Sequence, residues 1–137
     1  MAAVLAKAIL FEVRLVGADL RAADLGEANL IWANMNGVTL DHADMSSAKL
    51  SKTNLRKAAF NGTKLVKADL IGADLRGATF GSGANLTEAR LTGANLSGAD
   101  LSDAILWATV LDDIVYDEKT RWPESFDRAQ IGARNSY

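Results

Sequence analysis

Large apolar residues recur at every fifth position of this chain. Leu, Met or Phe occupies each such position from Leu5 to Phe80, and after one extra residue the spacing resumes from Leu86 to Leu111. We call these residues the centres of five-residue repeats, or pentads. An α-helix repeats at about 3.6 residues and a flat strand at 2, so neither element explains a period of five. A fixed short period over most of a chain predicts a solenoid whose structural unit is the repeat.

The other pentad positions also keep a constant character. A small residue, usually Ala, stands two places before each centre, and Asp or Asn often stands directly before it, at the pre-centre position. The two corner positions after the centre hold mostly Gly, Ser, Asn, Lys, Arg and Glu. Asn, Asp, Gly and Ser suit turns because they form local hydrogen bonds or tolerate positive φ. One large and one small apolar residue per pentad predict a narrow core, with the other three positions facing water.

Stretches such as residues 18–27 (ADLRAADLGE) and 94–103 (ANLSGADLSD) resemble the pentapeptide-repeat family, whose consensus is A-(D/N)-L-X-X. The resemblance implies an all-β solenoid: a right-handed quadrilateral β-helix with about 5.5 coils of four pentapeptides. A strand spacing of about 4.8 Å would make the rod roughly 25 Å long. Coils of four pentads predict that Phe60 and Phe80 stack on one side. They also predict that the extra residue within 81–83 is absorbed at a corner.

Both ends of the repeat region need a separate interpretation. We predict a β-helix over residues 1–113 and a C-terminal cap or tail over 114–137, where the pentad spacing fails and the only proline occurs. Residues 1–9 already follow the pentad spacing, which favours a first coil; a short capping helix is the alternative. An uncovered solenoid end exposes unpaired strand edges. The tail is therefore expected to cover the last coil and to include a short helical turn near residues 123–133.

Two tail residues are the candidate cap contacts, Trp122 and Phe126. Their Trp-Pro-x-x-Phe spacing is similar to a tail of short family members from photosynthetic bacteria. A dimer contact is the alternative role for both residues, because some family members join through their C-terminal ends. The chain is accordingly expected to be a monomer or a C-terminal end-to-end dimer.

Stacking of the coils predicts an outward column of apolar and small polar residues. Its members are Phe11, Ile31, Ser51, Ile71 and Thr92, with Trp32 beside them. A grouped apolar set that includes a Trp suggests a contact site, so Phe11, Ile31, Trp32 and Ile71 are candidate partner-binding residues. The alternative is that β-branched and aromatic residues merely suit a strand surface.

Charge is unevenly distributed, although the net charge is only −2. A basic belt without any acid lies between Met45 and Ala68: Lys49, Lys52, Arg56, Lys57, Lys64 and Lys67. The family resemblance implies a second possible function, DNA mimicry. Some family members resemble B-form DNA in width and negative charge, and they bind DNA gyrase and other type II topoisomerases. The belt interrupts the acidic faces that such a mimic requires, so this function is the alternative hypothesis. Nucleic acid is not the expected partner, because no aromatic residues that could stack on bases interleave with the lysines.

Motifs for catalysis or ligand binding are weak. His42, the only histidine, has Asp41 and Asp44 nearby, but it is expected on an outward corner without a pocket. The chain has no cysteine, which excludes a disulfide framework and thiol ligands. We therefore predict a non-enzymatic structural or protein-interaction module with no catalytic residue, cofactor or metal ligand. No apolar run approaches the roughly 20 residues of a membrane span, and no convincing signal peptide is present, which favours a cytoplasmic location.

Overall fold

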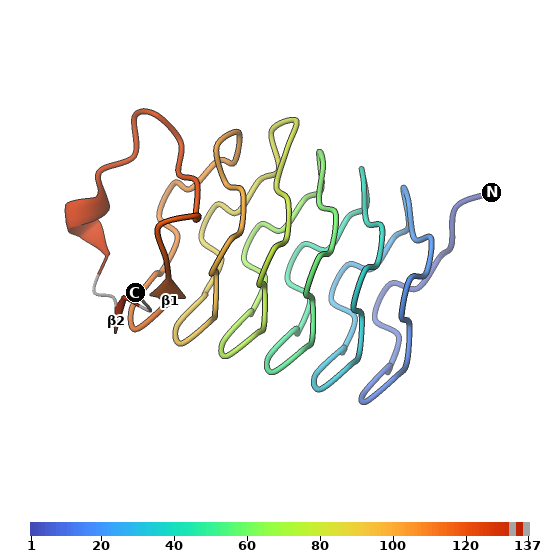
Figure 1. Ribbon diagram of the computed structural model, residues 1–137. Helices are drawn as coiled ribbons and strands as arrows, with labels where there is room; N and C mark the ends of the chain where they lie inside the picture. The colour runs from blue at the N-terminus through green and yellow to red at the C-terminus, as the bar shows by residue number, and fades with distance from the viewer. Residues whose placement is uncertain (132–133, 136–137) are drawn as a thin grey trace.

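The computed structural model describes residues 1–131 and 134–135. The chain winds into a rod of stacked coils, with the N-terminus at one end and the tail against the other (Figure 1). Parallel bridges join pre-centre residues 20 positions apart, beginning with Val4 to Asp24 and Ile9 to Asn29. Each pentad forms one side of a coil, so four pentads return the chain to the side on which it began.

The bridges define four sides, each with a column of centres. Side 1 carries Leu5, Leu25, Met45, Leu65, Leu86 and Leu106. Side 2 carries Leu10, Leu30, Leu50, Leu70, Leu91 and Leu111. Side 3 carries Leu15, Met35, Leu55, Leu75, Leu96 and Tyr116. Side 4 carries Leu20, Leu40, Phe60, Phe80, Leu101 and Trp122.

Hydrogen bonds inside each pentad explain why the chain turns. At the first corner, the N–H of Ala8 donates to the carbonyl of Leu5 at 3.0 Å, and Lys7 between them has a φ of 59°. A positive φ at the third residue of a four-residue turn is typical of type II turns. The pre-centre carboxylate adds a local bond, since the N–H of Gly26 donates to Oδ1 of Asp24 at 3.1 Å. The Asp and Asn preference therefore follows from turn formation.

The core is a continuous column of centres and small residues. The inner centres are inaccessible to solvent, and the rings of Phe60 and Phe80 stack with centroids 4.7 Å apart and planes 4° apart, which confirms the predicted contact. Thr53 and Thr63 occupy small positions and are buried. Their hydroxyls donate to the carbonyls of Leu30 and Leu40 in the preceding coil, each at 2.8 Å. Between Leu20 and Ala104 these two threonines are the only polar residues at centre or small positions, and both hydroxyls are hydrogen-bonded.

The extra residue is absorbed at the corner after Phe80, as predicted. Lys64 bridges Asn85, 21 positions further along, and the N–H of Leu65 donates to the carbonyl of Asn85 at 2.8 Å. Ser82 and Gly83 both have positive φ, 53° and 77°. The widened corner thus restores the stacking of Leu86 on Leu65.

Residues 1–9 belong to the first coil. Val4 and Ile9 bridge Asp24 and Asn29, and no helix covers this segment. The alternative of a capping helix is therefore wrong, because the same residues already pair with the second coil.

The bridge ladder continues past residue 113, where the sequence analysis places the end of the repeats. Strand β1 (Val115–Tyr116) follows the buried Ile114, Val115 bridges Asn95, and Arg121 bridges Asp100. Thr120 takes a small position, and its hydroxyl donates to the carbonyl of Leu96 at 3.0 Å. One extra residue between β1 and Thr120 hides this continuation from a search for five-residue spacing.

The rest of the tail lies against the last coil (Figure 1). A 3-10 helix, η1 (Arg128–Gln130), begins after Asp127, whose Oδ1 accepts from the N–H of Ala129 at 2.9 Å. It lies within the segment where a helical turn is predicted. Strand β2 (Arg134–Asn135) then pairs in parallel with β1. Residues 132–133 and 136–137 of the predicted tail lie outside the described residues.

Candidate protein-interaction surfaces

The candidate column on side 2 is assembled by backbone bonds between coils. The N–H of Glu12 donates to the carbonyl of Ile31, and the N–H of Lys52 donates to the carbonyl of Ile71, both at 3.0 Å. The side chain of Phe11 is 51% exposed, whereas Ile31 and Ile71 are half-buried. Ser51 separates Ile71 from Ile31 in this column. The candidates therefore divide into a compact group, Phe11, Ile31 and Trp32, which we call the side 2 patch, and the outlying Ile71.

Trp32 has the most unusual environment of these residues. It occupies the second corner position of its pentad, with a φ of 62°, and its side chain is 58% exposed. A bulky residue at positive φ is an outlier, and the other second corners with positive φ hold Gly, Ala, Ser, Lys, Glu, Asp or His. The corner conformation fixes the backbone from which the ring projects. The ring is thus presented to solvent rather than to the core.

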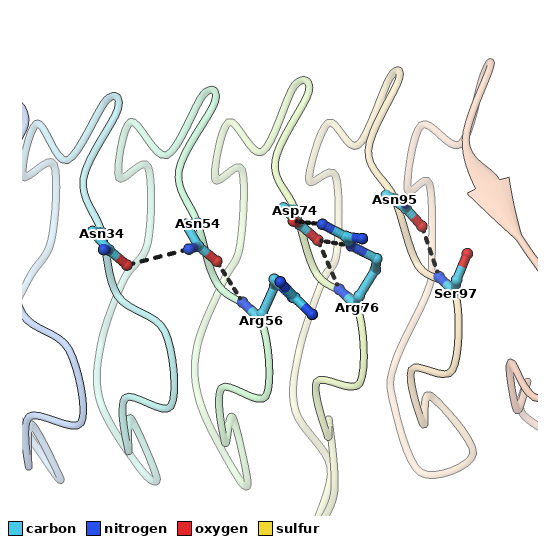
Figure 2. A network of polar contacts seen from close by, with 7 residues as sticks. All are labelled: Asn34, Asn54, Arg56, Asp74, Arg76, Asn95 and Ser97. Atoms are coloured by element: carbon cyan, nitrogen blue, oxygen red, sulfur yellow. Dashed lines mark hydrogen bonds and ion pairs between the residues drawn. The ribbon is translucent and has the colours of Figure 1, made fainter.

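Side 3 contrasts with side 2, because its polar groups satisfy one another (Figure 2). Nδ2 of Asn54 donates to Oδ1 of Asn34 at 3.2 Å. Arg76 donates to both carboxylate oxygens of Asp74, at 2.8 and 2.6 Å. Partial burial raises the pKa of Asp74, but the hydrogen bonds from Arg76 outweigh it and hold the pKa below its ordinary value. The resulting surface is polar, with local hydrogen bonds inside the pentads and one side-chain bond between coils.

The basic belt encircles three sides of the rod. Lys49 and Lys52 lie on side 2, Arg56 and Lys57 on side 3, and Lys64 and Lys67 on side 1. The hydrogen bond from the backbone of Ser46, followed by its side-chain bond, lowers the pKa of Asp44, and the charge of Lys64 adds to this effect. Sides 1, 2 and 3 therefore lack a continuous acidic face at mid-rod.

The C-terminal candidates meet in an aromatic cluster at the end of the core. The rings of Trp122 and Phe126 stack with centroids 5.1 Å apart, and Tyr116 meets the edge of Trp122 at 5.8 Å. All three are half-buried and pack against the core. Trp122 extends the column of Phe80 and Leu101, and Tyr116 extends that of Leu96. Large aromatic rings thus replace leucine where the core ends.

Sequence reasoning missed a second exposed apolar group near the tail. Ile105, Trp107 and Val110 are 45%, 68% and 37% exposed. Trp107 borders a groove of about 590 Å³ that Pro123 and Phe126 line from the tail side. The sequence did contain a signal for this group. Ile105 and Val110 are apolar β-branched residues at the pre-centre position, which is often Asp or Asn and faces water. Val4 and Ile9, 82% and 85% exposed, show the same signal at the opposite end.

The remaining candidate chemistry does not assemble into a site. His42 is exposed on a corner beside Gly62, and Oδ1 of Asp41 instead accepts from the N–H of Asn61 at 3.0 Å. Within residues 1–131 and 134–135, no group of three or more His, Cys, Asp or Glu side chains could hold a metal ion. No helix in this part of the chain is long and apolar enough to cross a bilayer.

Comparisons with known proteins identify the repeat. A family model described as pentapeptide repeats (8 copies) matches residues 14–51, 23–62, 43–81 and 82–109. The chain is similar to Rfr23, a pentapeptide repeat protein from the cyanobacterium Cyanothece 51142, with 35% identity, coverage of 72% of this chain and 63% of that one, and a TM-score of 0.44. The chain thus spans less than two thirds of the length of Rfr23.

Two further solved structures are similar. One is alr5209, a pentapeptide repeat protein from Nostoc Pcc 7120, with 33% identity, coverage of 68% of this chain and 84% of that one, and a TM-score of 0.39. The other is a trypsin-treated form of QnrB1, a plasmid-mediated fluoroquinolone resistance protein, with 21% identity, coverage of 91% and 78%, and a TM-score of 0.49. A search of curated proteins finds no significant match. The repeat matches show that this chain belongs to the pentapeptide-repeat family, which implies a right-handed quadrilateral β-helix.

Proposed function

We propose that this chain is a non-enzymatic protein-interaction module that binds a protein partner through the side 2 patch of Phe11, Ile31 and Trp32. Ile71 serves as an outlying contact on the same side. Interfaces are enriched in aromatic residues at their centre, and a rigid presenting surface lowers the entropy lost on binding. The stacked coils supply that rigidity, because each is hydrogen-bonded to its neighbours.

The observation that carries this proposal is the exposed ring of Trp32 at a φ of 62°. The left-handed region costs an L-residue roughly 1–2 kcal/mol, and glycine would avoid this cost. A bulky side chain retained in a strained conformation supports a functional role when the ring is not needed by the core. Here the ring faces solvent beside Ile31 and one coil from Phe11.

The test compares two variants with matched chemistry. Native protein, Trp32→Ala and Trp107→Ala are used as baits in the native cell extract, and the captured proteins are quantified. Loss of a captured protein with Trp32→Ala and its retention with Trp107→Ala supports the side 2 patch. Loss of the captured protein with Trp107→Ala alone would mean that the partner binds at the C-terminal groove instead of the side 2 patch. Equal capture by all three baits contradicts it.

The alternative function, a DNA-mimic binder of gyrase or type II topoisomerase, has less support. The belt carries positive charge around three sides at mid-rod, whereas a duplex mimic needs negative charge there. A gyrase supercoiling assay with micromolar protein separates the two functions. Inhibition that disappears on charge reversal of acidic surface residues would favour the mimic over the proposed module.

A further inference from the structure

The first coil ends in a row of unused backbone groups. Throughout the rod, a pre-centre residue directs both its N–H and its C=O at the preceding coil: the N–H of Asp24 donates to Ala3 at 2.9 Å, and its carbonyl accepts from Leu5 at 2.7 Å. Val4, Ile9, Arg14 and Asp19 hold this position in the first coil. Their backbone groups make no backbone hydrogen bond within the described residues. Four donors and four acceptors therefore point out of the N-terminal end.

The same end is apolar. Val4 and Ile9 are more than four-fifths exposed, and Leu5, Leu10 and Leu15 behind them are only half-buried. The inner coils carry no Val or Ile at this pentad position. Unpaired strand edges and exposed apolar side chains both favour association. At the C-terminal end, by contrast, β1 is paired with β2 and Phe126 lies against the core.

We propose that the N-terminal end of this chain binds the same end of a second copy across a two-fold axis. A two-fold axis perpendicular to the rod makes the facing strands antiparallel. In an antiparallel ladder, residues that direct both N–H and C=O at the partner strand pair directly and exchange two hydrogen bonds. The pre-centre residues of the first coil have this orientation. The interface is self-complementary, as a two-fold contact requires.

Side-chain chemistry selects one arrangement of the four that a square end allows. An axis through the corner between sides 1 and 2 pairs Val4 with Ile9 of the second copy and Arg14 with its Asp19. Each pair then occurs twice, as two apolar and two oppositely charged pairs. Two other axes pass through the middle of a side. One of them places Arg14 against Arg14 of the second copy, and the other places Asp19 against Asp19 of the second copy. The remaining corner axis places apolar residues against Arg14 and Asp19. Opposite charges and apolar pairs stabilise cross-strand contacts, and like charges weaken them.

The rise of the chain along the rod axis determines which of these residue pairs lie closest together in the dimer. The sides that carry Val4 and Ile9 lie foremost, and those that carry Arg14 and Asp19 lie further back along the spiral. The apolar pairs therefore form the backbone contacts, while the long Arg14 side chain reaches across the wider part of the joint. Asp19 already binds Arg21 at 2.7 Å and is more than half exposed, so it remains accessible to a second cation. The axis also brings Lys7 of the two copies together.

The first experiment measures the oligomeric state of the full chain by analytical ultracentrifugation over a concentration series. We expect a monomer–dimer equilibrium in which Ile9→Lys raises the dissociation constant by about tenfold or more, because the substitution replaces the apolar pair of Ile9 and Val4 by a charged and an apolar residue. Val110→Lys is the matched control, since Val110 holds the same position on side 2 in the last turn of the rod. Thermal melts of both variants establish that they are folded.

The second experiment tests the axis. Arg14→Glu and Asp19→Lys should each weaken the dimer by placing like charges together, and the double variant should restore it. Lys7→Ala should tighten the dimer, because it removes the one like-charge contact at the axis. Failure of the double variant to recover association would rule out this arrangement.

Every other outcome overturns the proposal. A monomer at all concentrations would show that the end does not self-associate. A dimer broken by Val110→Lys but not by Ile9→Lys would place the contact at the C-terminal end. A series of oligomers that grow with concentration, and that are absent for both Ile9→Lys and Val110→Lys, would indicate head-to-tail stacking of the rods.

Discussion

The second corner position of most pentads lies in the left-handed backbone region. Most such residues are glycine or have flexible polar side chains, but Trp32 is not of either kind. Replacing Trp32 by Gly relieves the backbone strain and removes little core packing, since the ring is 58% exposed. We expect the free energy of unfolding of Trp32→Gly to lie within about 1 kcal/mol of the native value. Denaturant titration measures it, and a loss of about 2 kcal/mol or more would mean that the ring supports the fold.

Pre-centre carboxylates make the rod sensitive to acid. Bonds from Ser46 lower the pKa of Asp44, and bonds from Ser102 lower that of Asp100, both below the ordinary value of 3.8. The unfolded chain then binds more protons than the folded one at low pH. The stabilisation is complete above the ordinary pKa and is lost as the pH falls through the folded values.

Unfolding midpoints measured between neutral pH and about pH 2 test this residue-scale expectation. The combined Asp44→Asn and Asp100→Asn variant should show a shallower decline, because Asn keeps the turn acceptor without titrating. Asn95 already does so, accepting from the N–H of Ser97 at 3.0 Å. An identical decline in native protein and variant would assign the acid sensitivity to other groups.

At the scale of the element, the coil tolerates an extra residue only at a corner. Ser82 lies in the widened corner after Phe80, at a φ of 53°. Deleting Ser82 leaves Phe-Gly-Gly-Ala, a regular pentad corner, so the protein should fold with unchanged stacking and equal or higher melting temperature. Deleting Asn61 from a regular coil instead shifts every later residue and should unfold the rod. Equal damage from both deletions would contradict the interpretation of the widened corner.

The same elements show what the sequence can and cannot predict. The core columns from Leu5 to Leu111 could be predicted from the spacing alone, because every centre is a large apolar residue at the same position of its pentad. The contact between Phe60 and Phe80 is the most specific prediction of this kind. The last turn escapes prediction because Tyr116 and Trp122 replace leucine and one extra residue precedes Thr120. Pairing of β1 with β2 depends on a long-range contact that no local pattern encodes. The exposed group at Ile105 was visible as a pre-centre anomaly, but its groove depends on how the tail folds back.

At the scale of the whole molecule, the two ends differ and the tail accounts for the difference. We propose that residues 122–131 cap the core, because Trp122 and Phe126 cover the ends of its columns. Truncation of the chain after Arg121 should expose Leu106, Leu111 and Ile114 and give larger assemblies than the full chain forms, as light scattering would detect. Trp122→Ala should cost less than the about 3–5 kcal/mol of a fully buried ring, since Trp122 is half-buried. A truncated chain that associates no more than the full chain would make the tail an appendage.

The step of 20 or 21 residues between bridged positions also determines how the rod responds to force. All inter-coil bonds lie along the rod axis, so a pull on the two termini loads one coil at a time and peels it from its neighbour. Each event frees one coil's length of chain, roughly 65 Å once extended. In a single copy, the first coil has a neighbouring coil on one side only within the described residues, so peeling starts there. A pull on that end would detach the rod in steps of 20 or 21 residues, whereas a pull on the tail would first have to separate the aromatic cluster from the core.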